Sequence, residues 1–520
     1  MSWEEIVASK RAVRDAAVAE FAFNGLTSPT ITADDDASSL VRRLKDGEVS
    51  TETVVRTYIN NACKAQAKTN CLTEVCFAAA IERAQALDAH YHTTGEVIGP
   101  LHGVPVSLKD QFDLKGIDST IGYVGRVSKP ATANAWIVDV LERLGAVVIA
   151  KTNLPQSIMW CETENPLFGL TTSPLNPLFT VGGSSGGEAA MLALHGSLIG
   201  FGTDIGGSIR MPAHMNGLWG LKPTSNRMSY RGVTVSTDGQ QHVPSSVGPM
   251  TRSLSSMITI TKAIVDAEPW SADAQCPRLP WRNDCLEEYS TRPLTIGLML
   301  DDGVVKVHPP IERLFRELVA KLQEAGHDVV QWDVGLNAQC VEIMDAYYTA
   351  DGGEDIKQAV AEGGEPFIPH VKALVERGPA ISVYEYWKLN RRKVAAQQAY
   401  HEMWNNARSS KGRPIDIILT PTMAHTSLPH RKCRWVGYTK LFNLLDYTAM
   451  SFPVGRVSKT LDSGSTNEYV PRNAYDTWNS AQYDSENMDG HHVGLQIVGR
   501  RYEEEKVLGT AVQIEKLLKG

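Results

Sequence analysis

The chain has 520 residues, of which 42% are hydrophobic and 21% charged, and its formal net charge is −8 at pH 7. This length and composition are typical of a globular protein that is large enough to bury its own core without disulfides or metals. The acidic balance disfavours a general nucleic-acid binder, because such proteins usually present a basic surface.

The sequence carries no recognisable targeting or membrane segment. Residues 1–5 include neither a basic nor an apolar stretch of the kind that opens a secretory signal. No run approaches the roughly 20 apolar residues that a membrane span needs, so we expect no membrane anchor. The eight cysteines form no CxxC pair and have no zinc-ligand spacing. These features predict reduced thiols, no metal site and a cytoplasmic location.

The N-terminal part of the chain is predicted to be helical. Apolar residues recur at steps of three and four over residues 4–21, 37–66 and 74–90. Ser50 fits the N-cap of a second helix within the 37–66 segment.

Strands and helices alternate from about residue 100 onward. A β-branched run over residues 104–108 predicts a strand that ends at Lys109, followed by a helix over 133–144 and a strand over 146–150. Later strands are expected over 294–300, 327–332, 416–419 and 493–498, and later helices over 310–324, 383–407 and 503–519. This alternation predicts an α/β fold whose sheet is covered by helices on both faces.

A polar, turn-rich segment interrupts this alternation at residues 455–492. It is either a long ordered surface loop or partly mobile. No linker divides the chain, which favours one large domain.

Two glycine-rich stretches lie between the predicted elements, over residues 182–188 and 202–210, separated by an expected helix over 188–195 and a strand over 198–201. So much glycine indicates backbone that bends sharply or closely approaches another group.

The second stretch places Ser208 directly after two glycines. Cleavage of an amide needs a nucleophile, a base and donors for the developing oxyanion. The backbone N–H groups that could converge beside the Ser208 hydroxyl are those of Ile205, Gly206, Gly207 and Ser208. The same Gly-Gly-Ser sequence also fits a plain helix N-cap. Asp204 and Arg210 bracket the turn, and we interpret them as an ion pair that supports it.

The first stretch offers a rival nucleophile. Ser184 lies in a Gly-x-Ser-x-Gly pattern, which is the nucleophile elbow of α/β-hydrolases, so an esterase that uses Ser184 is an alternative. A phosphate-binding loop is disfavoured because no Gly-Lys-Ser/Thr occurs there.

Lys109 is the candidate base. A lysine at the end of an apolar strand can lose its hydration, which lowers its pKa and lets the neutral amine accept a proton. The commoner role of such a lysine is to extend its charge toward water. The histidines near the motifs, His102, His195 and His214, show no distinctive spacing.

Taken together, several segments resemble the amidase signature family. They are residues 100–110, 151–157, 182–188, 202–212, 217–224, 246–253 and 495–500, and the resemblance extends over roughly residues 40–518. Within the family the chain is most similar to the fungal acetamidase and general amidase branch, which also resembles fatty-acid amide hydrolase.

The resemblance implies a role for individual residues. Ser208 matches the acylated nucleophile, Ser184 the bridging serine and Lys109 the base. The backbone N–H groups of residues 205–208 match the oxyanion hole, and Ile158 matches a position whose backbone touches the substrate. Trp160 and Cys161 fall in a region expected to line the acyl pocket.

The resemblance also implies a single large domain with a mixed central sheet of about eleven strands between helices. We expect residues 1–66 to form a helical segment packed on a catalytic domain of residues 67–520. The implied function is a serine amidohydrolase that cleaves a small-molecule amide without metal or organic cofactor and does not bind nucleic acid. A homodimer, an ammonia-transferring amidotransferase subunit, an inactive scaffold and the choice of amide all remain open.

Overall fold

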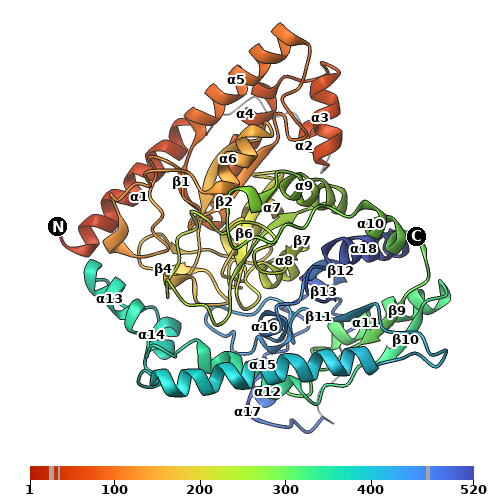
Figure 1. Ribbon diagram of the computed structural model, residues 1–520. Helices are drawn as coiled ribbons and strands as arrows, with labels where there is room; N and C mark the ends of the chain where they lie inside the picture. The colour runs from red at the N-terminus through yellow and green to blue at the C-terminus, as the bar shows by residue number, and fades with distance from the viewer. Residues whose placement is uncertain (23–28, 33–35, 464–468, 520) are drawn as a thin grey trace.

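The computed structural model describes residues 1–22, 29–32, 36–463 and 469–519. A mixed eleven-stranded sheet crosses the molecule in the order β1-β3-β2-β6-β8-β7-β12-β13-β11-β9-β10 (Figure 1). The predicted single α/β domain with about eleven strands is therefore confirmed. The strands of this sheet are β1 (Leu72–Val75), β2 (Pro105–Lys109), β3 (Val147–Thr152), β6 (Ile199–Asp204), β7 (Trp219–Lys222), β8 (Ser246–Thr251), β9 (Thr295–Leu298), β10 (Asp328–Gln331), β11 (Ile417–Pro421), β12 (Ala449–Arg456) and β13 (His492–Val498). A separate small hairpin consists of β4 (Glu164–Asn165) and β5 (Gly169–Leu170).

Helices pack around this sheet (Figure 1). They are α1 (Trp3–Glu20), α2 (Pro29–Thr32), α3 (Ala37–Lys45), α4 (Thr51–Thr69), α5 (Phe77–Thr94), α6 (Trp136–Arg143), α7 (Gly186–Ala193), α8 (Arg210–Asn216), α9 (Leu254–Asp266), α10 (Asn283–Thr291), α11 (Pro309–Glu324), α12 (Asn337–Tyr347), α13 (Glu354–Gly363), α14 (Pro369–Val375), α15 (Val383–Asn406), α16 (Gly437–Leu444), α17 (Ala474–Ala481) and α18 (Glu504–Lys519). Short 3₁₀ turns occur at η1 (Val124–Arg126), η2 (Gln156–Ile158) and η3 (Pro269–Ser271). Within the described ranges, no helix combines the length and apolarity needed to cross a bilayer.

Three neighbouring strands position the loops that matter for function. Strands β3, β2 and β6 run parallel, and β2 and β6 are buried along their whole length. Because the carboxyl ends of parallel strands meet at one edge of a sheet, the chain that leaves each of them gathers there. Lys109 at the end of β2 and Asp204 at the end of β6 therefore lie at the same edge.

The helix predicted over residues 74–90 is wrong at its start. Residues 72–75 form β1, which pairs antiparallel with β3, and the helix runs instead over Phe77–Thr94. Pairing with a neighbouring strand overrides the local helical pattern, as tertiary context often does. The 37–66 segment divides as expected, because the Ser50 side chain accepts a hydrogen bond from the Thr53 N–H at 3.2 Å at the start of α4.

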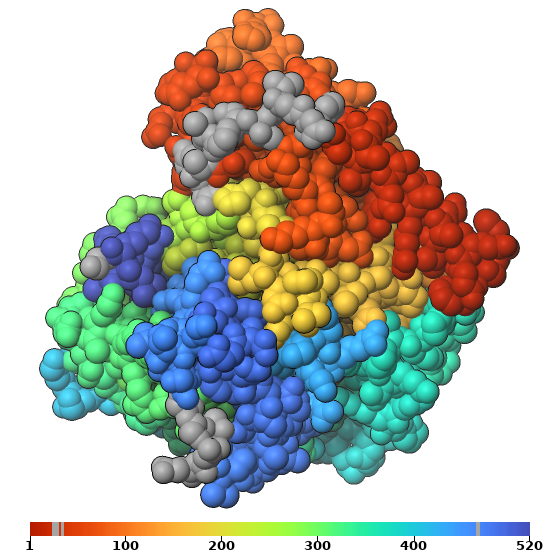
Figure 2. All heavy atoms as spheres, turned by 180° about the vertical axis from the view of Figure 1, so that it is seen from behind, coloured from red at the N-terminus to blue at the C-terminus, as the bar shows by residue number. Residues whose placement is uncertain are grey.

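The N-terminal helices are continuous with the rest of the molecule. Figure 2 shows the red and orange N-terminal part against the yellow central part. Side chains of α3 and α4 share one hydrophobic core with those of β2, β3 and β6. The expected boundary after residue 66 falls inside α4, so the division into an N-terminal segment and a catalytic domain stays a prediction.

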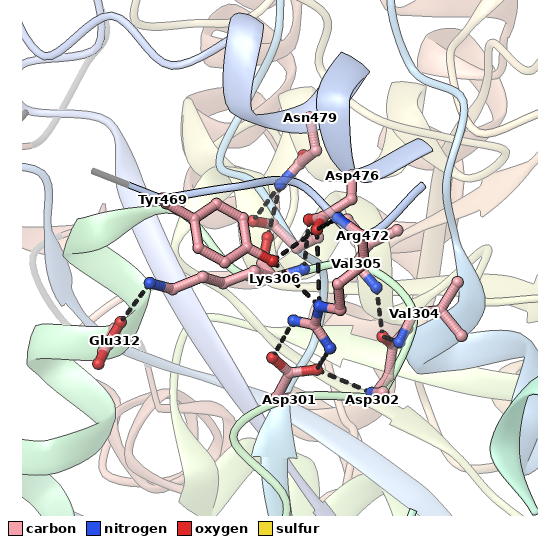
Figure 3. A network of polar contacts seen from close by, with 12 residues as sticks. Asp301, Asp302, Val304, Val305, Lys306, Glu312, Tyr469, Arg472, Asp476 and Asn479 are labelled. Carbon is pink, nitrogen blue, oxygen red and sulfur yellow. Dashed lines mark hydrogen bonds and ion pairs between the residues drawn. The ribbon is translucent and has the colours of Figure 1, made fainter. Parts of the chain in front are cut away.

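The polar segment 455–492 contains α17 and is fixed to the loop before α11. Asp476 accepts hydrogen bonds from the backbone N–H of Lys306 at 2.9 Å and of Arg472 at 2.9 Å, and from the Tyr469 hydroxyl at 2.5 Å (Figure 3). Arg472 in turn pairs with Asp301 at 2.5 Å. The described part of this segment is thus an ordered surface element, and residues 464–468 lie outside the described residues.

Asp476→Ala should loosen this element, because three donors lose their shared acceptor. We expect a loss of about 1–3 kcal/mol in the free energy of unfolding and faster amide hydrogen exchange over residues 469–481. Denaturant unfolding and exchange mass spectrometry measure the two effects. Asp484→Ala, which removes a carboxylate from an exposed turn just beyond α17, is the matched control. Equal rates of amide hydrogen exchange over residues 469–481 in both variants would contradict the conclusion that Asp476 holds this element in place.

Candidate active site

The three predicted catalytic side chains converge at the edge where β2 and β6 end. Lys109 is the last residue of β2, Ser184 lies in the loop before α7, and Ser208 lies in the turn between β6 and α8. The Lys109 amine donates a hydrogen bond to the Ser184 hydroxyl at 2.7 Å. Ser184 and Ser208 line one cavity of about 400 Å³. The Ser185 N–H donates to the Ser208 carbonyl at 3.0 Å, which ties the two glycine-rich loops together.

Glycine is required at two positions in these loops. Gly207 has φ +125°, and a Cβ atom there would collide with the Thr439 side chain. At Gly187 a Cβ atom would collide with the backbone N of Asn153. The glycines thus let the turn that carries Ser208 and the helix that follows Ser184 approach their neighbours closely.

Lys109 is sealed from solvent, with a side chain that is 0% exposed. Burial lowers its pKa to about 7, against the opposing attraction of the Asp204 and Glu188 carboxylates. The amine therefore does not extend into water as a strand-end lysine commonly does. A large fraction of it is neutral near physiological pH, which is the form that accepts a proton.

A second chain of hydrogen bonds holds the Lys109 amine from its other side. The amine donates to the Thr203 hydroxyl at 2.9 Å, and that hydroxyl donates to the Gln111 amide oxygen at 2.7 Å. The Gln111 amide nitrogen donates to the Tyr230 hydroxyl at 3.2 Å and the Thr234 carbonyl at 3.0 Å. Because the Thr203 hydroxyl donates its hydrogen bond to Gln111, the Thr203 oxygen is oriented to accept a hydrogen bond from the Lys109 amine. Thr203 and Gln111 were not predicted as site residues, because only the pairing of β2 with β6 brings them together.

Asp204 and Arg210 form the expected ion pair beneath the Ser208 turn. The guanidinium donates to the two carboxylate oxygens at 2.9 and 3.0 Å, and both side chains are fully buried. Burial alone would raise the pKa of Asp204, but Arg210, Lys222 and Asn443 together hold it well below its usual range.

The Asp204 carboxylate also accepts from backbone N–H groups in the turn. It accepts from Gly207 at 2.8 Å and from Ile209 at 3.2 Å. Of the four predicted oxyanion donors, Gly207 therefore has its N–H already engaged. The N–H groups of Gly206 and Ser208 have no acceptor among the described residues.

Ile158 also lines the cavity that holds Ser184 and Ser208. Its φ is 61° and that of Ser157 is 68°, so two successive residues adopt the left-handed conformation. The Ile158 N–H donates to the Pro155 carbonyl at 2.8 Å. Any contact between this backbone and a substrate would therefore use the carbonyl rather than the N–H group.

A carboxylate that the sequence analysis left without a role braces the start of α7. Glu188 contacts the Ser107 hydroxyl at 2.5 Å and the Thr152 hydroxyl at 2.7 Å, and thereby joins α7 to β2 and β3. Burial raises the pKa of Glu188 to about 8, against the opposing effect of the hydrogen bonds from Ser107 and Thr152 and of the charge on Lys109.

The neighbouring histidines are not arranged as bases. The His214 ring contacts the carbonyls of Gly494 and His425, each at 2.9 Å. Nδ1 of His102 accepts a hydrogen bond from the Ile98 N–H at 3.1 Å, and the described contacts of His102 do not include Ser184 or Ser208. Within the described ranges, no histidine lines the cavity that holds Ser184 and Ser208.

Comparison with known proteins identifies the family of this chain. The family model for amidases matches residues 53–508. The chain is 59% identical to "Amidase 1" of Gibberella moniliformis, with 99% of each chain covered, and 35% identical to the acetamidase of Aspergillus oryzae, also with 99% of each covered. Among solved structures, a fatty acid amide hydrolase superposes with a TM-score of 0.92 at 30% identity, covering 100% of this chain and 95% of that one. The protein therefore belongs to the amidase signature family of hydrolases, as the sequence motifs imply.

Gln111→Glu should shift the titration of Lys109. The carboxylate still accepts from Thr203, but its charge lies one hydroxyl away from the amine and favours the protonated lysine. We expect the rise of kcat/KM with pH to move toward alkaline pH. Gln111→Met is the neutral control, which should lower kcat about tenfold by loosening the base without moving the midpoint. Unchanged pH–rate profiles in both variants would show that Gln111 has no part in positioning Lys109.

Proposed function

We propose that the protein is a serine amidohydrolase that cleaves a linear carboxylic amide through the triad Lys109, Ser184 and Ser208. The observation that carries the proposal is the 2.7 Å hydrogen bond between the fully buried Lys109 amine and Ser184, in the cavity that also holds Ser208. A desolvated lysine beside a serine supplies the base that nucleophilic catalysis needs.

The chemistry proceeds in two acyl transfers. Neutral Lys109 takes the Ser184 proton while Ser184 takes that of Ser208, whose oxygen attacks the amide carbon. The proton then returns through Ser184 to the leaving nitrogen, the C–N bond breaks and an acyl-enzyme remains. Water, activated by the same relay, attacks the ester and releases the carboxylate.

The developing oxyanion requires donors that are not already engaged. In this mechanism the N–H groups of Gly206 and Ser208 bind it, with Ile205 at the edge of the group. Gly207 has a different task, because its bond to Asp204 holds the turn in shape. The Asp204–Arg210 pair supports the site from below in the same way.

Two observations favour this mechanism over an esterase with Ser184 as nucleophile. The Ser184 hydroxyl contacts a lysine, whereas the nucleophile elbow works with a histidine base. The cavity has no histidine among its described lining residues. The esterase alternative predicts that Lys109 is dispensable.

A fluorophosphonate should label Ser208, and peptide mass mapping locates the adduct. Lys109→Met should slow labelling by about 100-fold or more, since a general base contributes on that order. Lys151→Met is the matched control, because Lys151 is an equally buried strand lysine whose amine contacts the Asp118 carbonyl instead. It should label at the wild-type rate. An adduct on Ser184 that forms independently of Lys109 would favour the esterase.

Amide hydrolysis should rise with pH through a midpoint near 7. Burial depresses the pKa of Lys109 to about 7, so the neutral base is scarce below that pH and predominates above it. A kcat/KM profile from pH 5 to 9.5 measures this rise. A profile that falls or stays flat across pH 6–8 would contradict the role of neutral Lys109.

A further inference from the structure

Ser208 stands between two cavities of different size and chemistry. The larger, about 400 Å³, is lined by both Ser184 and Ser208. The smaller, about 80 Å³, is lined by Ser208 but not by Ser184. Under the proposed function, on which this inference rests, Ser184 hands the proton to the leaving nitrogen. The leaving group must then occupy the larger cavity and the acyl group the smaller one.

The smaller cavity has both apolar and positively charged lining residues. Its apolar lining residues are Ile158, Met159, Trp160, Cys161, Ile205, Met211, Leu374 and Val436. Its charged lining residues are Arg377, Arg434 and Lys440, and no carboxylate is found among the described residues that line it. The three cations come from separate segments: the turn after α14, the loop before α16, and α16 itself. The chain has a net charge of −8, so a cavity whose charged lining residues are all positive should favour the binding of an anion there.

Two of the three cations have no carboxylate to neutralise them. Lys440 pairs with Asp345 and lies over the Tyr348 ring at 5.4 Å. Arg377 and Arg434 are exposed residues that line this cavity, and their side chains form no ion pair or hydrogen bond with a described residue. Nearby Arg431 shows the contrast, since it pairs with Glu164 at 2.5 Å.

We propose that Arg377 and Arg434 select amides whose short acyl chain ends in an anionic group, in the simplest case the monoamide of a dicarboxylic acid. The acyl chain lies along the apolar lining from Ser208, and its terminal carboxylate meets the two guanidinium groups. Guanidinium binds carboxylate through paired, charge-assisted hydrogen bonds. Hydrolysis breaks the C–N bond, adds water and releases the dicarboxylate and the amine.

A matched pair of substrates tests this assignment. Succinic acid monoamide and butyramide have acyl chains of equal carbon number and differ in the terminal carboxylate. The wild-type enzyme should show a kcat/KM for the monoamide that is higher by roughly tenfold or more, as expected for a hydrogen bond to a charged group. The double variant Arg377→Gln/Arg434→Gln should lose this preference through a higher KM for the monoamide, with butyramide kinetics unchanged. Lys432→Gln removes an exposed charge that does not line the cavity and should keep the preference.

Binding to Ser208→Ala by calorimetry gives a readout that does not depend on turnover. The monoamide should bind more tightly than butyramide, and added salt or the double substitution should remove the difference. Equal binding of both amides, or a preference that survives the double substitution, would overturn the proposed anion selection. If butyramide is hydrolysed in a Ser208-dependent way but no anion preference appears, only this inference fails. If Ser208 is dispensable for hydrolysis of either amide, the proposed function itself fails.

Discussion

The burial of one lysine amine determines how the rest of this site is built. Lys109 has no contact with water, and its amine is held between the Ser184 and Thr203 hydroxyls. Taking an ammonium group out of water is costly, so the fold stabilises the neutral amine instead. A neutral amine in a fixed position is a base, and the structure around it fixes that position from several directions.

The geometry of the sheet makes this arrangement possible. Strands β2 and β6 are parallel neighbours, so Lys109 and Thr203 end up side by side although they are far apart in the chain. The fully buried Asp204–Arg210 pair then shapes the turn that presents Ser208. Breaking such a pair on one side leaves a buried charge uncompensated, which typically costs about 3–5 kcal/mol. Removal of either Asp204 or Arg210 should therefore destabilise the turn that carries Ser208.

Two cavities adjoin Ser208, and other segments of the chain line them. The turn after α14, the loop before α16 and α16 itself supply cations to the lining of the small cavity, whereas the loop over residues 235–245 lines much of the large one. These segments lie outside the motifs that carry Lys109, Ser184 and Ser208. Under the proposed function, the segments that contact the acyl and leaving groups are thus separate from the loops that carry the reacting side chains.

Several features could be predicted from the amino-acid sequence because their signals are local. Helix periodicity located α1, α4, α11 and α15, the Ser50 cap divided the N-terminal helices, and the glycine-rich stretches marked the loops of Ser184 and Ser208. The ion pair between Asp204 and Arg210 could also be predicted, because only six positions separate its members.

Other features depend on contacts between distant parts of the chain. The helix predicted over residues 74–90 began two residues inside strand β1, because only the pairing with β3 defines that strand. Gln111 reaches Lys109 through Thr203, which is 92 positions away, and the lining of the small cavity brings together Arg377 and Arg434. The sequence by itself determined which residues carry reactive groups and which family they resemble, because those signals lie in contiguous motifs. Only the tertiary structure decided how deeply Lys109 is buried, which backbone N–H groups lack an acceptor and which cavity beside Ser208 has basic lining residues. The physical reason is that burial and hydrogen-bond partners arise only when distant segments pack together.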